Sequence, residues 1–282
     1  MKLQPNQSSK SEILLALHHG DSPLLLPNVW NPVGARLLAA KGYPAIATAS
    51  AAISASLGYE DGEKIQRSTL LDVLARIAGG VGLPVSADIE AGYASTLSEL
   101  EETIEGLIDT GVVGINIEDS LDDGGTLRSS EDQCARLSMV RETAERRGLH
   151  LVINARVDSF LASSYSDIAE ATEDAVERAR AYAVAGADCI YPIGVGDEAT
   201  LRLLRARITS PLNALAIPGA SSLSTLASIG MNRVSFGPFV FRACLKKFSD
   251  IADAVLAGSD DMGLEEMYSK DEMSEFLREG PE

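Results

Sequence analysis

Short aliphatic runs alternate with longer amphipathic stretches along most of the chain, between about residues 24 and 236. Each run leads into a loop that carries glycine or an acidic residue, and several amphipathic stretches end at a glycine. Short apolar runs are typical of strands buried in a parallel sheet, whereas apolar residues three and four positions apart are typical of helices packed against it. The pattern predicts strands at residues 24–27, 44–48, 84–88, 113–117, 151–155, 188–191, 212–215 and 233–236.

Helices are predicted between these strands, at residues 32–41, 64–79, 97–109, 131–147, 171–185, 197–206 and 221–229. Gly42, Gly111 and Gly148 stand where helices should end, because glycine accepts the left-handed conformation that closes a helix. Eight strands that alternate with helices within 282 residues predict an α/β fold, a (β/α)8 barrel of the TIM type. A doubly wound open sheet is the alternative.

The chain after the eighth predicted strand also has a helical pattern. Residues 238–258 predict a further helix, and residues 261–282 form an acidic amphipathic tail. This extension is interpreted either as a surface helix that closes the barrel or as a docking element between subunits. No linker rich in Ser, Gly or Pro interrupts residues 20–245, so we expect a single barrel domain over residues 1–282 with a C-terminal helical extension at about 238–282.

The composition excludes several classes of protein. With 45% hydrophobic and 23% charged residues the chain can bury a large core, and its apolar stretches are too short for a membrane-spanning helix. A formal net charge of −17 argues against nucleic acid and anionic membranes as partners. The N-terminus lacks the pattern of a secretory signal, and three widely spaced cysteines form neither a disulfide framework nor a zinc motif, so we expect a cytoplasmic protein.

Acidic residues gather where two successive predicted strands end, which is where barrel enzymes build their active sites. Asp88 and Glu90 close the third strand and would point the same way if the strand continued through both. Glu118 and Asp119 close the fourth strand. Convergent carboxylates repel each other unless a cation or a proton separates them, and Mg2+ prefers oxygen ligands while keeping several waters. The pattern therefore predicts a magnesium site.

Other strand ends supply groups that could bind a substrate acid. Arg156, at the end of the fifth strand, can hold a carboxylate with its planar guanidinium, and it can also pair with Glu118 or Asp158. Ser50 lies in a run of small residues after the second strand, a run that also suits tight packing at the barrel mouth. Asn213, on the seventh strand, could donate to a substrate oxygen.

Absent motifs narrow the chemistry further. The sequence has no P-loop, no GxSxG elbow and no GxGxxG loop. His18 and His19 precede the first predicted strand, and His150 begins the fifth, away from the strand ends. Catalysis by histidine and a histidine-rich metal site are therefore not expected.

Seven segments of the chain form a distinctive series. They are Asn-Val-Trp-Asn-Pro at 28–32, Gly-Tyr-Pro-Ala-Ile at 42–46, Asp-Ile-Glu-Ala-Gly-Tyr at 88–93, Ile-Glu-Asp at 117–119, Ala-Arg-Val-Asp at 155–158, and the stretches at 211–219 and 234–238. In order and spacing, these segments resemble the isocitrate lyase/phosphoenolpyruvate mutase superfamily over roughly residues 24–242. The resemblance implies a magnesium-dependent enzyme, with Mn2+ as an alternative metal, that acts on 2-oxo or 2-hydroxy carboxylic acids through an enolate-like pyruvate fragment.

The resemblance assigns metal-binding roles to four carboxylates. Asp88 would be the direct metal ligand, and Asp61, Glu90 and Glu118 would hold metal-bound waters. It also implies a barrel in which the last helix is swapped between partners in a homotetramer, a dimer of dimers.

The same resemblance assigns the substrate site. Ser50 and the backbone of Ala51, together with Arg156, would bind the carboxylate of a small-molecule substrate, and Trp30 would form a wall of the pocket. Arg156 and Glu118 are the residues that we expect to take part in catalysis.

One loop departs from the lyases of this superfamily. Isocitrate and methylisocitrate lyases carry a Lys-Lys/Arg-Cys-Gly-His loop after the fourth strand, and its cysteine is the catalytic acid. Residues 118–130 contain no Cys, His or Lys, and Cys134 lies farther on, where we expect it to be packed within a helix. The candidates for a polar gating loop are Asp122, Asp123, Thr126 and Arg128.

Three functions follow from these observations. The leading one is a magnesium-dependent carbon–carbon lyase acting on a small 2-oxo or 2-hydroxy acid. Decarboxylation of an oxaloacetate-like acid is favoured within this class, because CO2 leaves and water can protonate the enolate. The second is P–C bond chemistry on phosphonopyruvate-type substrates, by a mutase or a hydrolase. The third is a catalytically silent barrel that retains the metal site.

Overall fold

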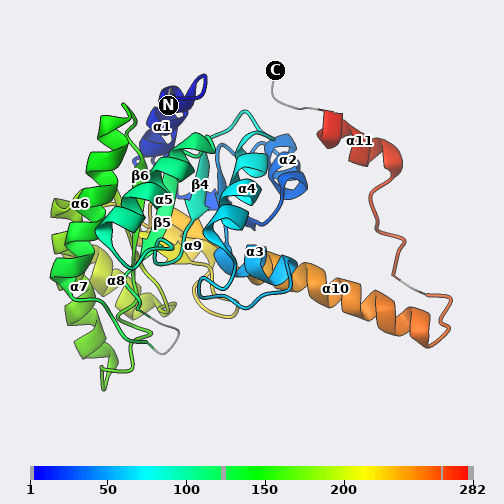
Figure 1. Ribbon diagram of the computed structural model, residues 1–282. Helices are drawn as coiled ribbons and strands as arrows, with labels where there is room; N and C mark the ends of the chain where they lie inside the picture. Colours follow the sequence, from blue (N-terminus) through cyan, green and yellow to red (C-terminus); the bar gives the residue numbers. More distant parts are fainter. Residues whose placement is uncertain (1–2, 122–124, 262, 279–282) are drawn as a thin grey trace.

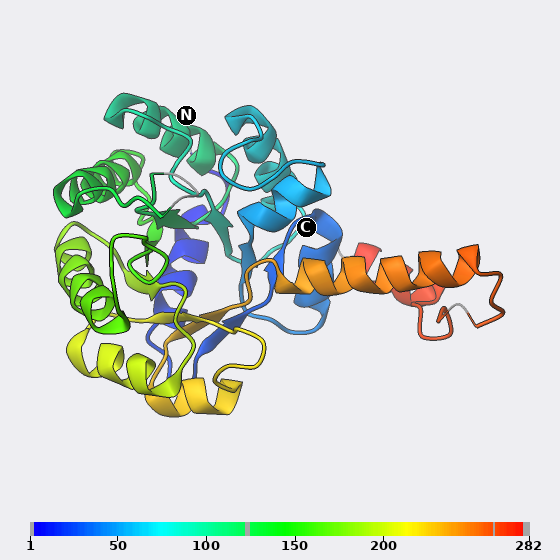
Figure 2. The ribbon, with the colours of Figure 1, turned by 90° about the horizontal axis from the view of Figure 1, so that it is seen from below.

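The computed structural model describes residues 3–121, 125–261 and 263–278, and in it a ring of parallel strands is surrounded by helices (Figures 1 and 2). The predicted α/β fold is confirmed. Its strands are β1 (Leu24–Leu26), β2 (Asn28–Val29), β3 (Ile46–Thr48), β4 (Val85–Asp88), β5 (Gly114–Glu118), β6 (Val152–Val157), β7 (Cys189–Pro192), β8 (Asn213–Leu215) and β9 (Arg233–Ser235).

The helices follow the alternation that the sequence predicts, with two additions near the N-terminus. The predicted helices between the strands correspond to α2 (Pro32–Ala40), α4 (Arg67–Ala78), α5 (Leu97–Asp109), α6 (Ser130–Arg146), α7 (Ile168–Val184), α8 (Glu198–Arg207) and α9 (Leu223–Ile229). The remaining helices are α1 (Gln7–Leu17), α3 (Ser50–Ser56), α10 (Phe239–Leu256) and α11 (Lys270–Arg278).

Pro27 divides the first barrel strand into two pieces, where the sequence predicted one. The first piece, β1, pairs with β9, and the second, β2, pairs with β3. The Asn28 side chain joins the two edges, because its Oδ1 accepts hydrogen bonds of 2.8 Å from the backbone N–H groups of Phe236 and Gly237 while its Nδ2 donates to the Thr48 carbonyl at 2.7 Å. A bridge between β7 and residue 212 links the two sheets on the other side, so the ring is closed.

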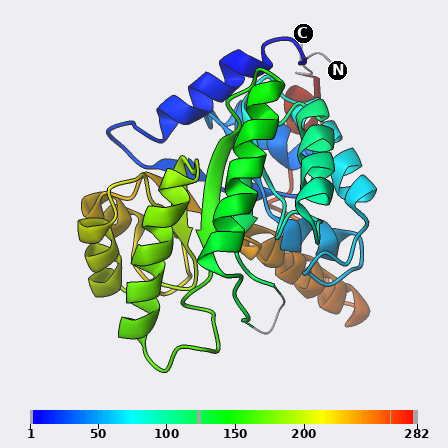
Figure 3. The ribbon, with the colours of Figure 1, turned by 60° about the vertical axis from the view of Figure 1, so that its left-hand side comes forward.

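Helix α1 closes the N-terminal end of the barrel, and the sequence pattern did not predict it (Figure 3). Leu14 packs there in one buried cluster with Leu24, Leu26, Val113 and Val152. Strand direction places the opposite, C-terminal end on the other side of the ring, where α10 leaves the barrel (Figure 3). Only that end is available for a site built from strand-end residues.

Helix α10 runs away from the barrel instead of covering it (Figure 2). Phe241 in its first turn is buried, but Leu245, Phe248 and Val255 farther along are 48%, 68% and 56% exposed. The following helix, α11, returns to α2, where Arg36 Nη1 donates to the Leu277 carbonyl at 2.7 Å. In this chain, helix α10 of the C-terminal extension therefore does not cover the barrel, as the interpretation of a closing surface helix required. Across the described ranges, no helix combines the length and apolar character needed to cross a bilayer.

Candidate active site

Two adjoining cavities open among the C-terminal ends of the strands, with volumes of about 200 and 210 Å3. Asp61 and Arg156 line both. Asp88 faces the first cavity, which we call the inner cavity, and Glu118 faces the second, the outer cavity. A larger groove of about 880 Å3 lies at the opposite end of the barrel beside α1 and contains none of the predicted site residues. The structure thus brings most of the predicted site together at one end.

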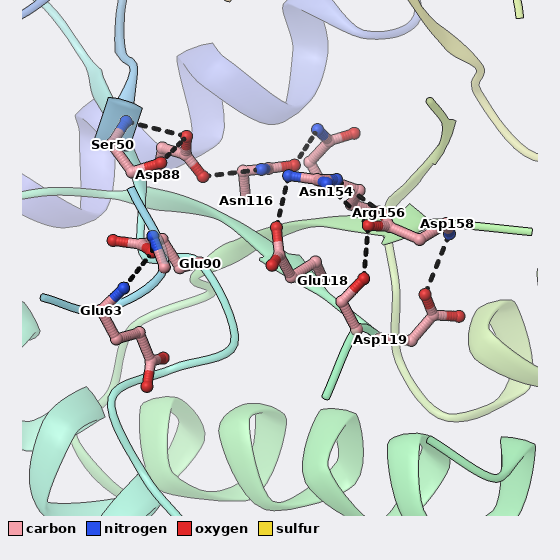
Figure 4. A network of polar contacts seen from close by, with 12 residues as sticks. Ser50, Glu63, Asp88, Glu90, Asn116, Glu118, Asp119, Asn154, Arg156 and Asp158 are labelled. Carbon is pink, nitrogen blue, oxygen red and sulfur yellow. Dashed lines mark hydrogen bonds and ion pairs between the residues drawn. The ribbon is translucent and has the colours of Figure 1, made fainter. Parts of the chain in front are cut away.

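Asp88, the last residue of β4, is held by hydrogen bonds from two sides (Figure 4). Its Oδ2 accepts from the backbone N–H and the hydroxyl of Ser50, both at 2.9 Å. Its Oδ1 accepts from Asn116 Nδ2 at 2.8 Å, and Asn154 Nδ2 in turn donates to Asn116 Oδ1 at 2.9 Å. These bonds fix the carboxylate and leave one lone pair of Oδ1 free for a metal ion, since each carboxylate oxygen has two lone pairs and Oδ2 accepts two bonds.

Glu90 does not point the same way as Asp88, because the strand ends at Asp88 and does not continue through residue 90 as the sequence argument assumed. Its backbone is left-handed, with a φ of 53°, which turns the side chain toward the outer cavity. There Oε2 accepts from the backbone N–H groups of Gly62 and Glu63 at 2.8 and 2.5 Å, and Oε1 accepts from the Tyr93 hydroxyl at 2.7 Å. Glu90 is therefore buried and held by the loop before α4.

Arg156 is fixed between two carboxylates, one of the interpretations that the sequence left open. Its Nε and Nη2 donate to Asp158 Oδ1 and Oδ2 at 2.7 and 2.6 Å, and its Nη1 pairs with Glu118 Oε2 (Figure 4). Asp158 is itself buried and accepts from Ser120 Oγ at 2.6 Å. A guanidinium has five N–H donors, so two remain available to a ligand in the adjoining cavities.

The carboxylates of this site repel each other and are poorly hydrated. Burial raises the pKa of Glu90 to about 7, although the hydrogen bond from Tyr93 opposes the rise, and the charge of Asp61 adds to it. Burial also raises the pKa of Glu118, although Arg156 opposes the rise, and burial followed by the charge of Asp88 raises the pKa of Asp61. A cation would favour the ionised form of each group, and all these donors are the oxygen type that Mg2+ prefers. The donor set therefore fits magnesium.

A complete cage of protein ligands is not needed for that fit. Within the part of the chain that the structure describes, no three His, Cys, Asp or Glu side chains form a ready metal-binding group. The predicted site asks for one direct protein ligand, Asp88, with the other carboxylates acting through water. Mg2+ commonly keeps several waters in this way.

The residues predicted to bind substrate are placed differently from one another. Ser50 and Ala51 begin α3 and line the inner cavity, but the Ser50 hydroxyl is already bonded to Asp88. Asn213 is buried and exchanges hydrogen bonds with Ser235 Oγ at 3.0 and 3.2 Å. Trp30 packs edge-on against Phe241 of α10, with ring centroids 5.0 Å apart. Asn213 and Trp30 are not among the residues lining either cavity, so their roles stay predictions.

The segment after β5 supports the site from behind. Asp119 turns away from the cavities and accepts from the Tyr182 hydroxyl at 2.6 Å and from the Asp158 backbone N–H at 2.9 Å. Cys134 packs against the core from α6, as predicted. Of the loop candidates, Arg128 donates its backbone N–H to the Asp119 carbonyl at 2.8 Å. Asp122 and Asp123 lie outside the described residues, and the gating role of Thr126 and Arg128 stays a prediction.

Sequence reasoning missed several polar residues that line the inner cavity. Asn116 and Asn154 precede Glu118 and Arg156 by two positions, so the alternation of a strand could have placed them on the same face. Arg233 opens β9 and lines the same cavity. It had no comparable signal, because a charged residue at the start of a strand is usually at the barrel rim.

The geometry agrees with what comparison with known proteins finds. The family model described as phosphoenolpyruvate phosphomutase matches residues 14–256. The chain belongs to the phosphoenolpyruvate mutase/isocitrate lyase superfamily. The superfamily comprises lyases, mutases and hydrolases of small acids, and members of it bind Mg2+.

Two curated relatives in this superfamily cover most of the chain. An uncharacterised protein of Mycobacterium tuberculosis is 31% identical over 242 residues, which are 86% of this chain and 88% of the relative. An oxaloacetate decarboxylase of Ectopseudomonas mendocina is 31% identical over 229 residues, which are 79% of this chain and 76% of the enzyme.

Solved structures of the superfamily share the fold. A Burkholderia cenocepacia protein provisionally assigned as a phosphonomutase is 34% identical, with a TM-score of 0.82 over 90% of this chain and 100% of that one. A phosphonopyruvate hydrolase, solved in complex with oxalate and Mg2+, has a TM-score of 0.82 over 95% of each chain. At 22% identity it supports the fold alone.

Proposed function

We propose that this protein is a magnesium-dependent lyase that cleaves a carbon–carbon bond in a small 2-oxo or 2-hydroxy carboxylic acid through an enolate. The observation that carries the proposal is the pairing of a fixed Asp88 with a fixed Arg156 across one cavity of about 200 Å3. That volume suits a small acid, since sites for drug-sized ligands start at about 300 Å3. The 31% identity to an oxaloacetate decarboxylase supports the same class of reaction.

Each side chain has a defined task in this proposal. Asp88 holds Mg2+ directly, and Asp61, Glu90 and Glu118 hold it through water, with Mn2+ as an alternative metal. The two unused donors of Arg156 and the backbone of Ala51 bind the substrate carboxylate. The bound cation would stabilise the negative charge that develops as an enolate forms, an effect worth several kcal/mol.

Oxaloacetate is the simplest substrate to consider. The bond between C3 and the distal carboxylate breaks, CO2 departs, and its bonding electrons remain on C3 as the enolate of pyruvate. Glu118 and Asp158 keep Arg156 oriented throughout, because they occupy three of its five N–H donors and leave two for the substrate. Water supplies the proton that completes pyruvate, so no cysteine acid is required.

The test is pyruvate release from a panel of 2-oxo and 2-hydroxy acids with Mg2+. Asp88→Asn should abolish enzymatic release, whereas Asp72→Asn, an exposed aspartate on α4, should leave it unchanged. The Asp88→Asn protein at the same Mg2+ concentration also corrects for decarboxylation by the free metal ion. No turnover of any acid by a protein that binds Mg2+ would refute the proposal, and the silent metal-binding barrel would then be the better description.

Phosphonopyruvate in the same panel separates the alternative P–C chemistry. The specific observation in its favour is the 34% identity to the provisionally assigned phosphonomutase. Release of inorganic phosphate, without pyruvate release from the carboxylic acids, would replace the carbon–carbon lyase by a P–C hydrolase. Isomerisation to phosphoenolpyruvate would replace it by a mutase.

We also propose that α10 packs on a second copy of the chain, as the swapped helix of a homotetramer. Phe241, Leu245, Phe248 and Val255 recur at intervals of four, three and seven residues and form one apolar stripe. All but the first are exposed. An apolar stripe of this length is ordinarily covered in solution.

A further inference from the structure

Arg233 is a buried cation that lines the inner cavity without a carboxylate partner. It is 2% exposed and shares the inward face of β9 with Ser235. Its Nε lies 3.4 Å from Ser235 Oγ and its Nη1 lies 3.5 Å from Ser86 Oγ, both beyond the usual range for N–H···O bonds. Among residues 3–121, 125–261 and 263–278, no carboxylate lies within 4.0 Å of it and Nη2 has no hydrogen bond.

Such a charge is costly to bury, and the chain avoids the cost at its other buried arginines. Arg178, which is 8% exposed, pairs with Asp119 and with Asp174. Arg136 has no carboxylate partner but donates to the carbonyl groups of Ala91 and Ala94. Burial lowers the pKa of Arg233, and the charge of Asp88 is among the effects that oppose this. A buried cation without a carboxylate partner in the cavity wall points to a ligand.

The position of Arg233 in the cavity indicates where that ligand lies. Its neighbour Ser86 precedes Asp88 by two residues on β4, so both face inward and are separated by roughly 6–7 Å along the strand. Arg233 therefore lies one layer deeper in the barrel than the Asp88 carboxylate. The other cation of the cavity, Arg156, is already bound to Glu118 and Asp158.

The rest of the deep layer is neutral and polar. Next to Arg233 the inner cavity is lined by the hydroxyls of Ser86 and Ser235, which can turn either a donor or an acceptor toward a ligand. Asn116 donates to Asp88 and therefore lies at the level of that carboxylate, above Arg233. An anion that enters the layer of Arg233 meets one guanidinium, and the carboxylate of Asp88 lies one layer above.

We propose that Arg233 binds a second carboxylate of the substrate and thereby selects small diacids over monoacids of the same length. The inference rests on the proposed function and adds to it the substrate class. One acid group lies at the level of Asp88 and Arg156, and the other reaches the layer of Arg233, a separation that suits a diacid of four or five carbons. The ion pair provides binding and specificity. It does not assist the departure of that carboxylate as CO2, because it stabilises the anion and not the neutral product.

The test compares two acids that differ only at the distal group, malate and 2-hydroxybutyrate, each titrated calorimetrically into the protein with Mg2+. The wild-type protein should bind malate at least tenfold more tightly, because a charge-assisted hydrogen-bonded pair in a buried site is strong. In Arg233→Met, the affinity for malate should fall to within about threefold of that for 2-hydroxybutyrate, whose own affinity should stay unchanged. Arg233→Lys should recover part of the preference.

Stability gives a second readout that a merely structural role would not produce. Without ligand, Arg233→Met should melt at the same temperature as the wild type or higher, because an unpaired buried charge is replaced by an apolar chain of similar length. Arg178→Met, the matched control, should melt lower, because it leaves the buried Asp119 without its cation.

The outcomes separate the two proposals. Equal binding of the two acids by the wild-type protein overturns the role of Arg233 whether or not the variants fold, and so does an unchanged malate preference in Arg233→Met. If the wild-type protein with Mg2+ binds neither of the two acids nor oxalate, the proposed function itself is refuted. Binding of oxalate and of both acids without preference refutes the inference about Arg233 alone.

Discussion

His18 should make the stability of the barrel depend on pH between about 7 and 4. The imidazole is fully buried at the end of α1, with Nδ1 2.8 Å from the Leu14 carbonyl oxygen and Nε2 without a hydrogen-bond partner among the described residues. Burial, reinforced by the charge of Arg233 and opposed by the Leu14 hydrogen bond and by Asp188, lowers the pKa of His18 from 6.5 to about 4. In the folded protein the ring therefore stays neutral well below pH 6.5.

The sign and size of the effect follow from this difference. Between pH 6.5 and about 4 the unfolded chain binds a proton at this residue and the folded chain does not, so stability decreases as the pH falls. Each tenfold difference in proton affinity is worth about 1.4 kcal/mol, which gives a total loss of about 3 kcal/mol. Well above pH 6.5 neither the folded nor the unfolded chain binds a proton at this residue, so it contributes no pH dependence there.

Urea denaturation at several pH values, followed by circular dichroism, measures the loss. His18→Asn is the reference, because an amide can keep the bond to the Leu14 carbonyl without titrating. Subtracting its free energy of unfolding from that of the wild type at each pH removes the contribution of all other titratable groups. The wild type should lose about 3 kcal/mol relative to this variant from pH 7 to 4, or about 1 M in the urea midpoint. A flat difference for His18→Asn would refute the reasoning.

Three further changes test other parts of the structure. Arg136→Met should lower the free energy of unfolding by about 1–3 kcal/mol in urea, because the carbonyl groups of Ala91 and Ala94 lose their buried donor; an unchanged midpoint would contradict this. Gly114→Ala should lower the free energy of unfolding by about 1–3 kcal/mol, since the added Cβ would lie 2.6 Å from Leu14 Cδ2. A melting temperature equal to that of the wild type would count against tight packing under α1. Phe248→Glu should convert the proposed tetramer to smaller species in sedimentation velocity, whereas a variant that sediments like the wild type would argue that α10 is not an interface.

Much of the barrel could be predicted because its strands are short aliphatic runs between helices that end in glycine. The misses have physical reasons. Helix α1 buries Gln7 and Ser11 alongside Leu14, so its inward face lacks the apolar periodicity on which helix prediction depends. Helix α3 has seven residues, of which six are Ala or Ser, so it lacks the apolar periodicity on which helix prediction depends. The interruption at Pro27 depends on the pairing of β1 with β9, a strand more than 200 residues away.

The candidate site was predictable where function coincides with the end of a strand. Asp88, Glu118 and Arg156 were found on that basis, and the structure brings them to one end of the barrel. The predicted direction of the Glu90 side chain was wrong. The left-handed backbone at this glutamate is set by the loop around it and cannot be predicted from the residue types. Arg233 was missed because it stands out only as a buried arginine without a carboxylate partner. The sequence does not show which side chains pack around it.

The hydrogen bonds by which Asn28 joins the two edges of the barrel have a consequence for folding during synthesis. Its Oδ1 binds backbone groups that follow it by 208 and 209 residues, so the ring stays open until residue 237 has left the ribosome. Until then the edge of β1 has no neighbouring strand, and unpaired edges invite association with other chains. A nascent or prematurely terminated chain that lacks residues 233–237 should therefore need a chaperone to prevent aggregation through the exposed edge of β1.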